Sequence, residues 1–541
     1  MKSFYRRFCA NATYFTHQGR PLPKGGLLTR EERDGISSLP FFHESIHLRS
    51  RARRTSTRQE YLEKKLPDVR RAFGSDPDYP EYLPFKLPKD RPNPYWDAHL
   101  GRTVDPDTGK EIIHGKPRLS VTKLLTKRWC ELRESYDIYA KAPIYEHAQV
   151  IEGLETHQKL EDETHRISED WLEFMEHFEV AIPTDEYHEL VGSWYESIVK
   201  LVNLFMVGEA REVLCHGFLD PNSCQMIEGP TISEEEVLVS GVIDHLILTH
   251  RDCIHDKPIE LSGCMESGSN LNIADVISQL EGQRELLKQK YQIVVSDIKT
   301  RSIRKVPTQN SVVKSTKLQV MYYRSFLETL GSSPSNTYQR LLLNAQRRKM
   351  HIDKPIEPSK LISIMAASDL IISDMRCLRD GQDIGFETYD DHFSSTSPVD
   401  TYDMSHFHDL ITDVNVILKF EEFFTLWSRP PTLRYFAARL AQMYHEVAPL
   451  LSDTLLIEYY CQGENFHNII FDYDPELIKS ECFNSASFWF GKRDIEPIKP
   501  TLKNVMTYCK YCDYEEVCLW RKQITDKCRQ LGSDLEKITE E

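Results

Sequence analysis

An acidic residue and a lysine stand two positions apart where an apolar segment of the chain ends. The segment reads YQIVVSDIKT and places Asp297, Ile298 and Lys299 near its carboxyl end. Alternate side chains of a β-strand point to the same face, so Asp297 and Lys299 would share a face that Ile298 does not. Asp244 ends another apolar segment, VLVSGVIDH, in a comparable position. Two carboxylates at adjacent strand ends can bind Mg²⁺ or Mn²⁺, which prefer oxygen ligands.

A lysine beside such a metal site indicates phosphodiester hydrolysis. A bound divalent ion lowers the pKa of its water and neutralises charge on a phosphoryl oxygen. The ammonium group of Lys299 can orient the nucleophile or stabilise the transition state. The Asp-x-Lys pattern is short, however, and charged residues at a strand end are more often simply solvated. The interpretation therefore depends on the neighbouring residues.

Polar residues in other segments of the chain could join these acids in one site. His157 and Glu161 are four positions apart, as are Gln319 and Tyr323, and this spacing puts each pair on one face of a helix. Glu212 lies in the strand-like segment REVLCHG. A helical histidine is more often structural than a metal ligand, and a basic run is often an exposed loop. The basic residues that could bind phosphate after Lys299 are Arg301, Arg304 and Lys305.

Three cysteines near the end of the chain predict a second metal centre. Cys509, Cys512 and Cys518 lie in YCKYCDYEEVCLW, a segment with few apolar core positions, where a bound metal can replace a core. Zinc and iron–sulfur clusters both accept four thiolates, and the spacing does not separate them. The residues alone also leave the fourth ligand open between Cys528, which is nearest, and Cys482.

Both strands and helices must position these side chains. Segments rich in Val and Ile predict strands over residues 211–219, 236–248, 291–300, 454–460 and 468–473. Apolar residues at helical spacing predict helices over residues 119–141, 150–178, 195–205 and 317–330. Residues 249–290 are interpreted as an insertion ending in a charged helix, and the polar residues 380–404 as a flexible insertion.

The expected organisation has five parts. These are a basic N-terminal extension over residues 1–75, a loop-rich lead-in over 76–118, a nuclease core over 119–330, a mostly helical region over 331–500 and a cysteine segment over 501–541. Residues 1–30 contain six basic residues and no acid, which is typical of a mitochondrial transit peptide or of a disordered basic tail. A second basic run over residues 49–71 could be a solvated linker or contact phosphates.

Composition limits the class of protein. The chain has 541 residues, 40% of them hydrophobic, which is enough for a large core. No apolar run approaches the roughly 20 residues that span a bilayer, so we expect a soluble protein with no membrane segment. Thirteen scattered cysteines favour a reducing compartment. The net charge of −16 argues against general coating of nucleic acid, although a local basic groove is compatible with it.

Taken in order, these motifs resemble the RecB-type nuclease module of the PD-(D/E)XK superfamily. The matching residues are Gly153 and His157, Arg211 and Glu212, Gly241 to Asp244, Asp297 to Arg301, and Gln319 with Tyr323. The resemblance implies an α/β fold, a restriction-endonuclease-like mixed sheet flanked by helices. It also implies Asp244, Asp297 and His157 as metal ligands and Lys299 as the catalytic lysine. Gln319 and Tyr323 would position the active site or the DNA.

The resemblance extends to the exonuclease V family, through WCELRESY, LLIEYYCQ, FWFGKRDIEP and the cysteine segment. It implies that Cys130, Cys509, Cys512 and Cys518 hold a [4Fe-4S] cluster that joins the two ends of the nuclease. It further implies a metal-dependent exonuclease specific for single-stranded DNA, with 5′ ends favoured in fungal-type members and a role in mitochondrial DNA maintenance. The long insertions and the extended N-terminus depart from the family pattern.

Two other classes of protein remain as alternatives. One is a catalytically inactive nucleic-acid-binding protein stabilised by zinc; the intact set of Asp244, Asp297 and Lys299 weighs against it. The other is an endonuclease, or the nuclease subunit of a helicase complex. The chain has no G-x4-G-K-[ST] phosphate loop, so a helicase motor would be another protein. We expect a monomer, with a single-strand-binding protein or a helicase as a possible partner, and a nuclear or cytoplasmic location as the alternative to mitochondria.

Overall fold

Two compact units make up the chain in the computed structural model. The structure describes residues 93–100, 102–104, 111–113, 118–140, 148–166, 180–229, 235–251, 258–261, 272–395, 402–410, 414–499 and 502–512, and single residues at 171, 174, 178, 514, 515, 518, 520, 521, 523, 526 and 530. One unit comprises Leu87–Tyr139 and Pro143–Glu496, and the other comprises Met1–Lys86, Ala140–Ala142 and Pro497–Glu541. The predicted N-terminal extension with its transit peptide, the second basic run and Cys528 lie outside the described residues.

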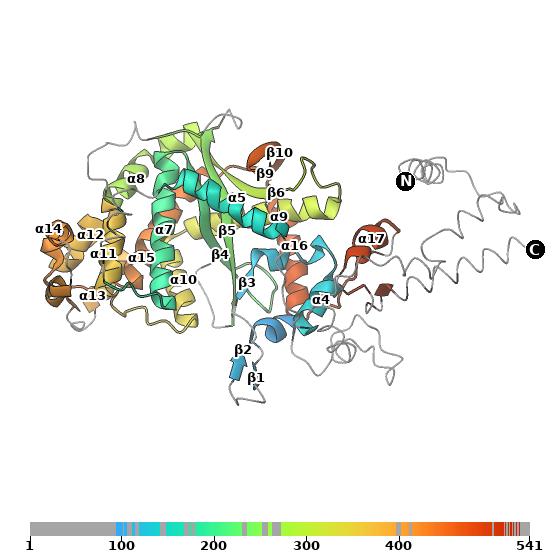
Figure 1. Cartoon of the computed structure of the whole chain (residues 1–541), viewed down its shortest axis with the longest axis horizontal. Helices are drawn as coiled ribbons and strands as arrows, with labels where there is room; N and C mark the ends of the chain where they lie inside the picture. Colours follow the sequence, from blue (N-terminus) through green and yellow to red (C-terminus); the bar gives the residue numbers. More distant parts are fainter. Residues whose placement is uncertain are drawn as a thin grey trace, which may run out of the picture. The chain divides into compact units, whose positions relative to one another are not determined.

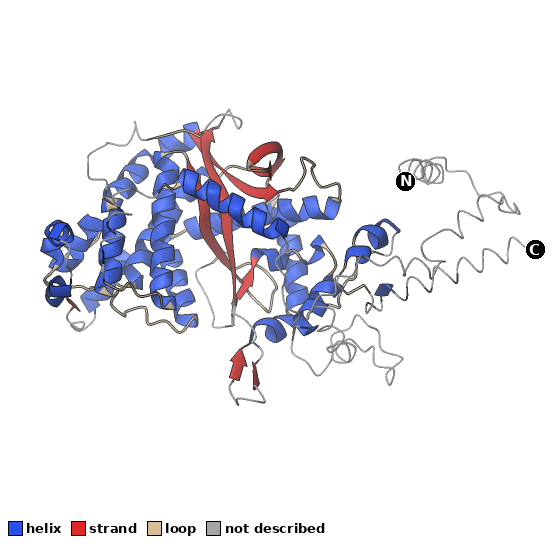
Figure 2. Cartoon of the chain, viewed as in Figure 1, coloured by secondary structure: helices blue, strands red, loops and turns tan. Residues whose placement is uncertain are grey.

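A mixed six-stranded sheet forms the centre of the larger unit (Figure 2). Its strands run in the order β10-β9-β6-β5-β3, and β4 pairs with β5. The β3–β5 and β6–β9 pairs are parallel, and the other pairs are antiparallel. The strand bounds are β3 (Arg118–Ser120), β4 (Glu209–Leu219), β5 (Val237–His250), β6 (Tyr291–Thr300), β9 (Thr454–Cys461) and β10 (Glu464–Asp472).

The long strand β5 branches the sheet. Along one edge it pairs with β4 from Val237 to Ile247. Its other edge pairs with β3 at residues 238–240 and with β6 at residues 245–250. Residues 241–244 therefore lie where β3 and β6 diverge, and Asp244 is the last of them. The branch opens the sheet next to this carboxylate.

Helices cover the sheet and extend beyond it (Figure 1). α5 packs against β4 and β6, α7 against β4 and β5, and α9 against β4, β5, β6 and β9. α15 packs on α7, α9 and α10. The helices of the larger unit are α4 (Glu131–Ala140), α5 (Ala148–Thr164), α7 (Glu186–Met206), α8 (Ile273–Lys290), α9 (Asn310–Gly331), α10 (Pro334–Arg347), α11 (Pro358–Ala367), α12 (Ile372–Asp380), α13 (Glu387–Ser395), α14 (Val414–Phe420), α15 (Leu433–Val447) and α16 (Pro475–Trp489).

Shorter elements complete the described structure. The larger unit has two small antiparallel pairs, β1 (Arg102–Val104) with β2 (Glu111–Ile113) and β7 (Tyr402–Asp403) with β8 (Leu426–Trp427). It also has a π-helical turn η2 (Trp96–Leu100) and the 3-10 turns η3 (Val121–Leu124), η4 (Thr126–Arg128), η5 (Asp369–Ile371), η6 (Ser405–Leu410), η7 (Glu421–Phe423) and η8 (Ala448–Leu450). The other unit contains α17 (Leu502–Thr507) and the 3-10 turn η9 (Cys509–Tyr511).

Local sequence explains several helix boundaries. The Asp185 side chain accepts hydrogen bonds from the backbone N–H groups of Tyr187 and His188, so α7 begins well before the predicted 195–205. Asn272 caps α8 by accepting from the N–H of Asp275 at 2.9 Å. α5 ends at Thr164, earlier than the predicted residue 178. The residues of the helix predicted over 119–141 instead divide between β3, two 3-10 turns and α4, because Leu119 pairs with Val239 of β5.

The five predicted strands are present, and part of the polar segment in the helical region is itself a helix. Residues 380–404 were expected to be a flexible insertion, yet Glu387–Ser395 form α13. Asp390 stabilises its start by accepting hydrogen bonds from the N–H groups of Ile384, Gly385 and Phe386. The predicted insertion over 249–290 is β-strand through His250 and helix α8 from Ile273. Within the described residues no helix has the length and apolar content to cross a membrane.

A buried ion pair connects the segments WCELRESY and FWFGKRDIEP, two of the motifs that resemble the exonuclease V family. Glu131, in WCELRESY, is fully buried, and Arg493, in FWFGKRDIEP, donates to it at 2.8 Å. The backbone N–H of Glu496 and the hydroxyl of Thr126 also donate to the Glu131 carboxylate. Because a buried charge is costly unless it is paired, these contacts hold the first residue of α4 against the segment after α16.

Candidate active site

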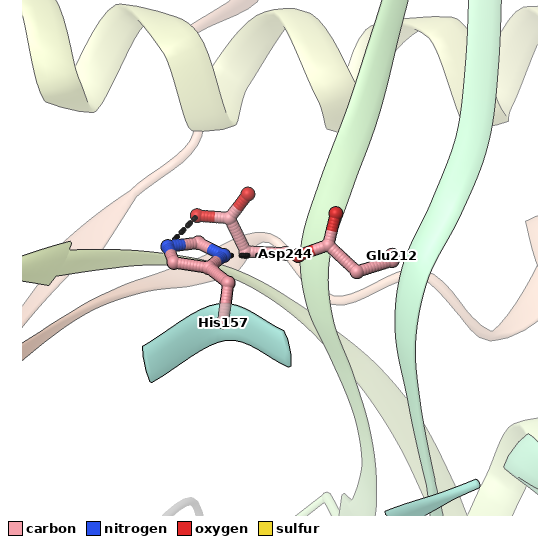
Figure 3. Close-up of side chains that lie close together, drawn as sticks. All are labelled: His157, Glu212 and Asp244. Atoms are coloured by element: carbon pink, nitrogen blue, oxygen red, sulfur yellow. Dashed lines mark hydrogen bonds and ion pairs between the residues drawn. The ribbon is translucent and has the colours of Figure 1, made fainter. Parts of the chain in front are cut away.

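A histidine and two carboxylates from three elements converge beside the branch in β5 (Figure 3). His157 projects from α5, Glu212 from β4 and Asp244 from β5. Nδ1 of His157 lies 2.9 Å from Oε1 of Glu212, and its Nε2 lies 4.0 Å from Oδ2 of Asp244. One ligand atom from each residue lies within 4.8 Å of the other two, which is the spacing that a single metal ion requires. The two carboxylates offer the oxygen donors that Mg²⁺ and Mn²⁺ prefer, and the imidazole adds a nitrogen donor.

Asp244 lies on β5, and its side chain bonds the backbone of the neighbouring strand β6. The β5–β6 ladder ends at the pair His245 and Ser296, so the next residues along the two strands are Asp244 and Asp297. Oδ2 of Asp244 accepts the backbone N–H of Ile298 at 2.7 Å. The carboxylate thus continues the ladder by one side-chain hydrogen bond, which fixes its orientation at the opening of the sheet.

Asp297 and Lys299 form an ion pair next to these ligands. Nζ of Lys299 lies 2.6 Å from Oδ2 of Asp297, and Asp297 is fully buried. Oδ1 of Asp297 has no hydrogen-bond partner among the described residues. A buried carboxylate oxygen of this kind is available to a cation that approaches from the branch. The structure thus brings Asp297 beside Asp244, although Asp297 is outside the set of three that can reach one ion.

Burial and neighbouring charges set the protonation of the site. Burial, opposed by the charge of Lys299 and supported by the nearby Asp244, raises the pKa of Asp297 to about 7. Burial also raises the pKa of Asp244, partly opposed by Lys299 and His157. Burial alone would lower the pKa of His157, but the hydrogen bond to Glu212 and the charge of Asp244 raise it overall. All three shifts favour the protonated forms of these side chains.

Glu212 has a backbone conformation that non-glycine residues seldom adopt. Its φ is +51°, within a strand whose neighbours Arg211 and Val213 pair regularly with β5. The ammonium group of Lys200 on α7 donates to the carbonyl oxygen of Glu212 at 3.2 Å and to Oε1 of Glu161 at 2.6 Å. Lys200 thereby holds the rotated peptide group, and the Glu212 side chain faces His157. Strained residues of this kind cluster at functional sites.

Two glycines of the motifs permit close packing around the site. A Cβ atom at Gly241 would lie 2.7 Å from the ring of Tyr323, so α9 can approach β5 only if this residue has no side chain. A Cβ atom at Gly153 would lie 3.0 Å from the hydroxyl oxygen of Thr300, where α5 meets the end of β6. Nε2 of Gln319 donates to the hydroxyl of Tyr323 at 2.8 Å, and both side chains are buried. Burial raises the pKa of Tyr323, and the charges of Asp297 and Asp244 add to this.

The predicted phosphate-binding residues differ in their surroundings. Arg301 is half-buried and its Nε has no hydrogen-bond partner among the described residues. Arg304 is exposed and forms an ion pair with Glu464 of β10, and Lys305 is exposed. Arg128, which the sequence did not indicate, has a buried unpaired Nε and lies within electrostatic reach of Asp297. Positive charge thus lies at the β6 end and in the turn before α4.

The predicted cluster cysteines belong to different units. Cys130 directly precedes α4 in the larger unit, where its carbonyl oxygen accepts the N–H of Arg133. In the other unit, Cys509 begins η9, and the N–H of Cys512 donates to its carbonyl oxygen at 3.2 Å. Each of these three thiols, like that of Cys518, is half-buried, whereas Cys482, an open candidate for the fourth ligand, is completely buried. Burial raises the pKa of Cys482 to about 12, which opposes the thiolate form that a metal needs.

Sequence reasoning noticed Glu212 but did not include it among the metal ligands. The available signal was its place in the R-E-V motif, yet Glu209 lies in the same strand with the same donor chemistry. Lys200 and Arg128 had no signal, because a lysine in an amphipathic helix and an arginine in a basic turn are usually solvated. Glu161, which shares a helical face with His157, binds Lys200 and not the candidate metal position.

These residues together define a class of protein. A helix-flanked mixed sheet that carries a histidine, clustered carboxylates and a lysine at adjoining strand ends is typical of hydrolases that cleave phosphodiester bonds. The chain matches the family described as exonuclease V, a 5′ deoxyribonuclease, over residues 113–521.

Curated relatives agree with this class across nearly the whole chain. A protein of Vanderwaltozyma polyspora named "Exonuclease V, mitochondrial" is 46% identical over 523 residues, covering 95% of this chain and 94% of the relative. Proteins of the same name from Kluyveromyces lactis and Saccharomyces cerevisiae are 43% and 36% identical, covering 91% and 95% of this chain and 91% and 90% of the relatives. The chain belongs to the exonuclease V family and is an exodeoxyribonuclease.

Proposed function

We propose that this protein is a metal-dependent mitochondrial exonuclease that degrades single-stranded DNA from 5′ ends. The observation that carries the proposal is the convergence of His157, Glu212 and Asp244 within 4.8 Å, next to the Asp297–Lys299 ion pair. The architecture expected of this function is the PD-(D/E)XK type of mixed sheet, and the branch at β5 and the sheet order are the features that support it.

The chain's own residues have separate roles in this proposal. His157, Glu212 and Asp244 would hold a Mg²⁺ or Mn²⁺ ion, and Asp297 would contribute a further oxygen. Such an ion supplies an activated water and neutralises charge on the phosphate. Lys299 orients the attacking water and stabilises the negative charge that develops on the phosphoryl oxygens. The side chains of Gln319 and Tyr323 on α9 are hydrogen-bonded to each other, and the Tyr323 ring packs on Gly241 of β5, which holds α9 close to the strand that carries Asp244.

Substrate binding depends on positive charge beside the sheet opening. Arg301 contributes directly, and Arg304 and Lys305 lie on the exposed turn that follows β6. Because the whole chain has a net charge of −16, this local charge must guide the DNA backbone to the site. Binding through phosphate contacts weakens as salt concentration rises, so cleavage should do the same. Mitochondrial DNA maintenance is the process in which such an enzyme would act.

A [4Fe-4S] cluster held by Cys130, Cys509, Cys512 and Cys518 is the structural part of the proposal. The exonuclease V resemblance and the half-buried state of these cysteines support it. Its role would be to hold the two ends of the nuclease together, because ligands from distant segments share one centre. Protein purified without oxygen should be brown, with broad absorbance near roughly 400 nm. A colourless protein with one zinc ion per chain would reject the cluster.

The decisive test of the function is digestion of end-labelled single-stranded DNA with Mg²⁺. Four substrates are compared: free ends, a blocked 5′ end, a blocked 3′ end and both ends blocked. The proposal expects short products from free 5′ ends and strong inhibition by the 5′ block alone. Cleavage of the doubly blocked strand would identify an endonuclease. Absence of cleavage by protein that still binds DNA would favour the binding protein.

A further inference from the structure

Tyr459 lies on β9 at the position that pairs with Lys299, and its hydroxyl group has no hydrogen-bond partner among the described residues. In the parallel register of β6 and β9, Tyr459 pairs with Lys299, and Ile457 pairs with Asp297. The Tyr459 side chain is 1% exposed, and its hydroxyl makes no hydrogen bond within the described part of the chain. An unpaired buried hydroxyl destabilises the fold. Its position next to Lys299 therefore needs a physical reason.

The surroundings of the hydroxyl point to an anionic ligand. Burial raises the pKa of Tyr459, while the charges of Arg301 and Asp297 act on it from nearby in opposite directions. Nε of Arg301 is also buried without a hydrogen-bond partner among the described residues. The backbone N–H of Arg301 donates to the carbonyl oxygen of Tyr460 at 2.8 Å, which fixes the arginine to the end of β9. Two unused donors thus lie close together, one just after the end of β6 and one on β9 at the residue that pairs with Lys299.

The tyrosine ring is held in place by β10. Its centroid lies 6.2 Å from that of Phe466 and 6.4 Å from that of His467, both on the adjacent strand. A ring fixed by aromatic neighbours loses little entropy when its hydroxyl meets a ligand. A donor prepared in this way is suited to an oxygen that carries negative charge.

We propose that the Tyr459 hydroxyl and the Arg301 guanidinium bind a phosphate of the DNA strand beside Lys299, which makes Tyr459 a substrate-contact residue. The inference rests on the proposed nuclease function and extends it by naming the group that touches the backbone. A phosphate oxygen gives the hydroxyl the acceptor that the fold does not supply. The cost of burying the hydroxyl is then recovered only when DNA is bound.

The test removes the hydroxyl and keeps the ring. In Tyr459→Phe, kcat/KM for a single-stranded oligonucleotide with Mg²⁺ should fall about tenfold to a hundredfold, because a hydrogen bond to a charged group is lost. Its Tm should stay the same or rise, because no internal bond is broken. The matched control is Tyr322→Phe. Tyr322 is 0% exposed, and its hydroxyl likewise has no hydrogen-bond partner among the described residues, but the titratable groups near it are Cys482 and Glu481 on α16. This control should match Tyr459→Phe in Tm and the wild type in activity.

Each other outcome overturns the inference. Wild-type kcat/KM in Tyr459→Phe would mean that the hydroxyl does not contact the substrate. A lower Tm would mean that it has a partner inside the fold, and equal activity losses in both variants would trace the effect to packing. Binding of the oligonucleotide without divalent metal gives an independent measure, in which Tyr459→Phe alone should have a raised Kd. If the wild type did not cleave at all, the proposed function would fail, and this binding comparison would still decide the role of Tyr459.

Discussion

Two clusters in this protein each combine one histidine with two carboxylates, yet only one of them can hold a metal ion. In the active-site cluster, His157 bonds Glu212 through Nδ1, and Nε2 lies 4.0 Å from Asp244. In the second cluster, Nδ1 of His245 lies 2.9 Å from Glu458, and Nε2 lies 2.9 Å from Glu209. Adjacent residues of β5, Asp244 and His245, thus belong to clusters with different partners.

The spacing of the ligand atoms separates the two clusters. One ligand atom each from His157, Glu212 and Asp244 lies within 4.8 Å of the other two, and the described residues contain no such set built on His245. Glu209 and Glu458 each lie 2.9 Å from one ring nitrogen of His245, so both nitrogens already have a partner. Ser296 also donates to Glu458, and the His245 side chain is only 5% exposed. His157 is 26% exposed, and Nε2 still has space toward Asp244. A saturated, buried cluster stabilises a fold, whereas an open one can bind a ligand.

The electrostatic consequences follow the same division. Burial would lower the pKa of His245, but Glu458 and Glu209 raise it overall. Burial would raise the pKa of Glu458, but His245 and Ser296 lower it overall. Opposite shifts of this kind describe a stable internal ion pair. At the candidate site, by contrast, the two neighbouring aspartates both have raised pKa values, because both are buried and each lies close to another carboxylate.

The largest expected effect separates the clusters by activity. Asp244→Asn should lower kcat on single-stranded DNA at saturating Mg²⁺ by at least about a thousandfold, because the amide keeps the bond from Ile298 but loses the metal-binding charge. Glu209→Gln, the matched change in the buried cluster, should stay within about fivefold of the wild type. Initial rates measure both. Equal losses would mean that the buried cluster takes part in the chemistry.

The second effect separates the two clusters by their contribution to the free energy of unfolding. Glu458→Leu should lower the free energy of unfolding by about 3 kcal/mol, because His245 and Ser296 lose their buried acceptor. Glu212→Leu should cost less than about 1 kcal/mol, because Glu212 is 26% exposed and its neighbours include another carboxylate. Urea unfolding in the presence of EDTA gives both values. The reverse order would contradict the distinction between the clusters.

The third effect concerns the lysine behind Glu212. Lys200→Met removes the ammonium group that holds the Glu212 carbonyl and should weaken Mn²⁺ binding about tenfold to a hundredfold. Calorimetric titration without DNA measures this directly. Lys314→Met is the control, since Lys314 pairs with Glu481 on another helix and contacts none of the metal-site residues. Unchanged Mn²⁺ affinity in Lys200→Met would mean that β4 maintains the conformation of Glu212 without help from Lys200.

The smallest effect is a pH-dependent stability difference in the metal-free protein. The folded-state pKa of Asp297 is about 7, above its ordinary value of 3.8, so the folded chain loses stability as pH rises through this interval. Asp297→Asn removes this cost. Its Tm in EDTA should exceed that of the wild type by a few degrees at pH 8, and the gap should shrink at pH 5.5. A constant gap would show that another group is responsible.

The sequence supported much of the fold because its strands are locally distinctive. Runs such as YQIVVSDIKT and EVLVSGVIDHLIL have the β-branched content of buried strands, and they form β6 and β5. The prediction of secondary structure failed where strand pairing outweighed the local spacing of apolar residues. Leu119 pairs with β5 as part of β3, although the residues after it repeat at helical spacing. Composition also gave no signal for α13, where Asp390 accepts backbone hydrogen bonds at the start of a helix in a polar segment that had the composition of a loop.

For the candidate site, the sequence alone determined the donor chemistry: two aspartates and a lysine at strand ends, a histidine on a helix and an ordered set of motifs. Only the tertiary structure decided that Glu212 rather than Glu209 faces His157, that Lys200 supports it and that Asp244 continues the β6 ladder. The physical reason is the distance along the sequence over which each property is set. Residue type and strand alternation are local properties, whereas the convergence of α5, β4, β5, β6 and α7 depends on how a branched sheet packs against its helices.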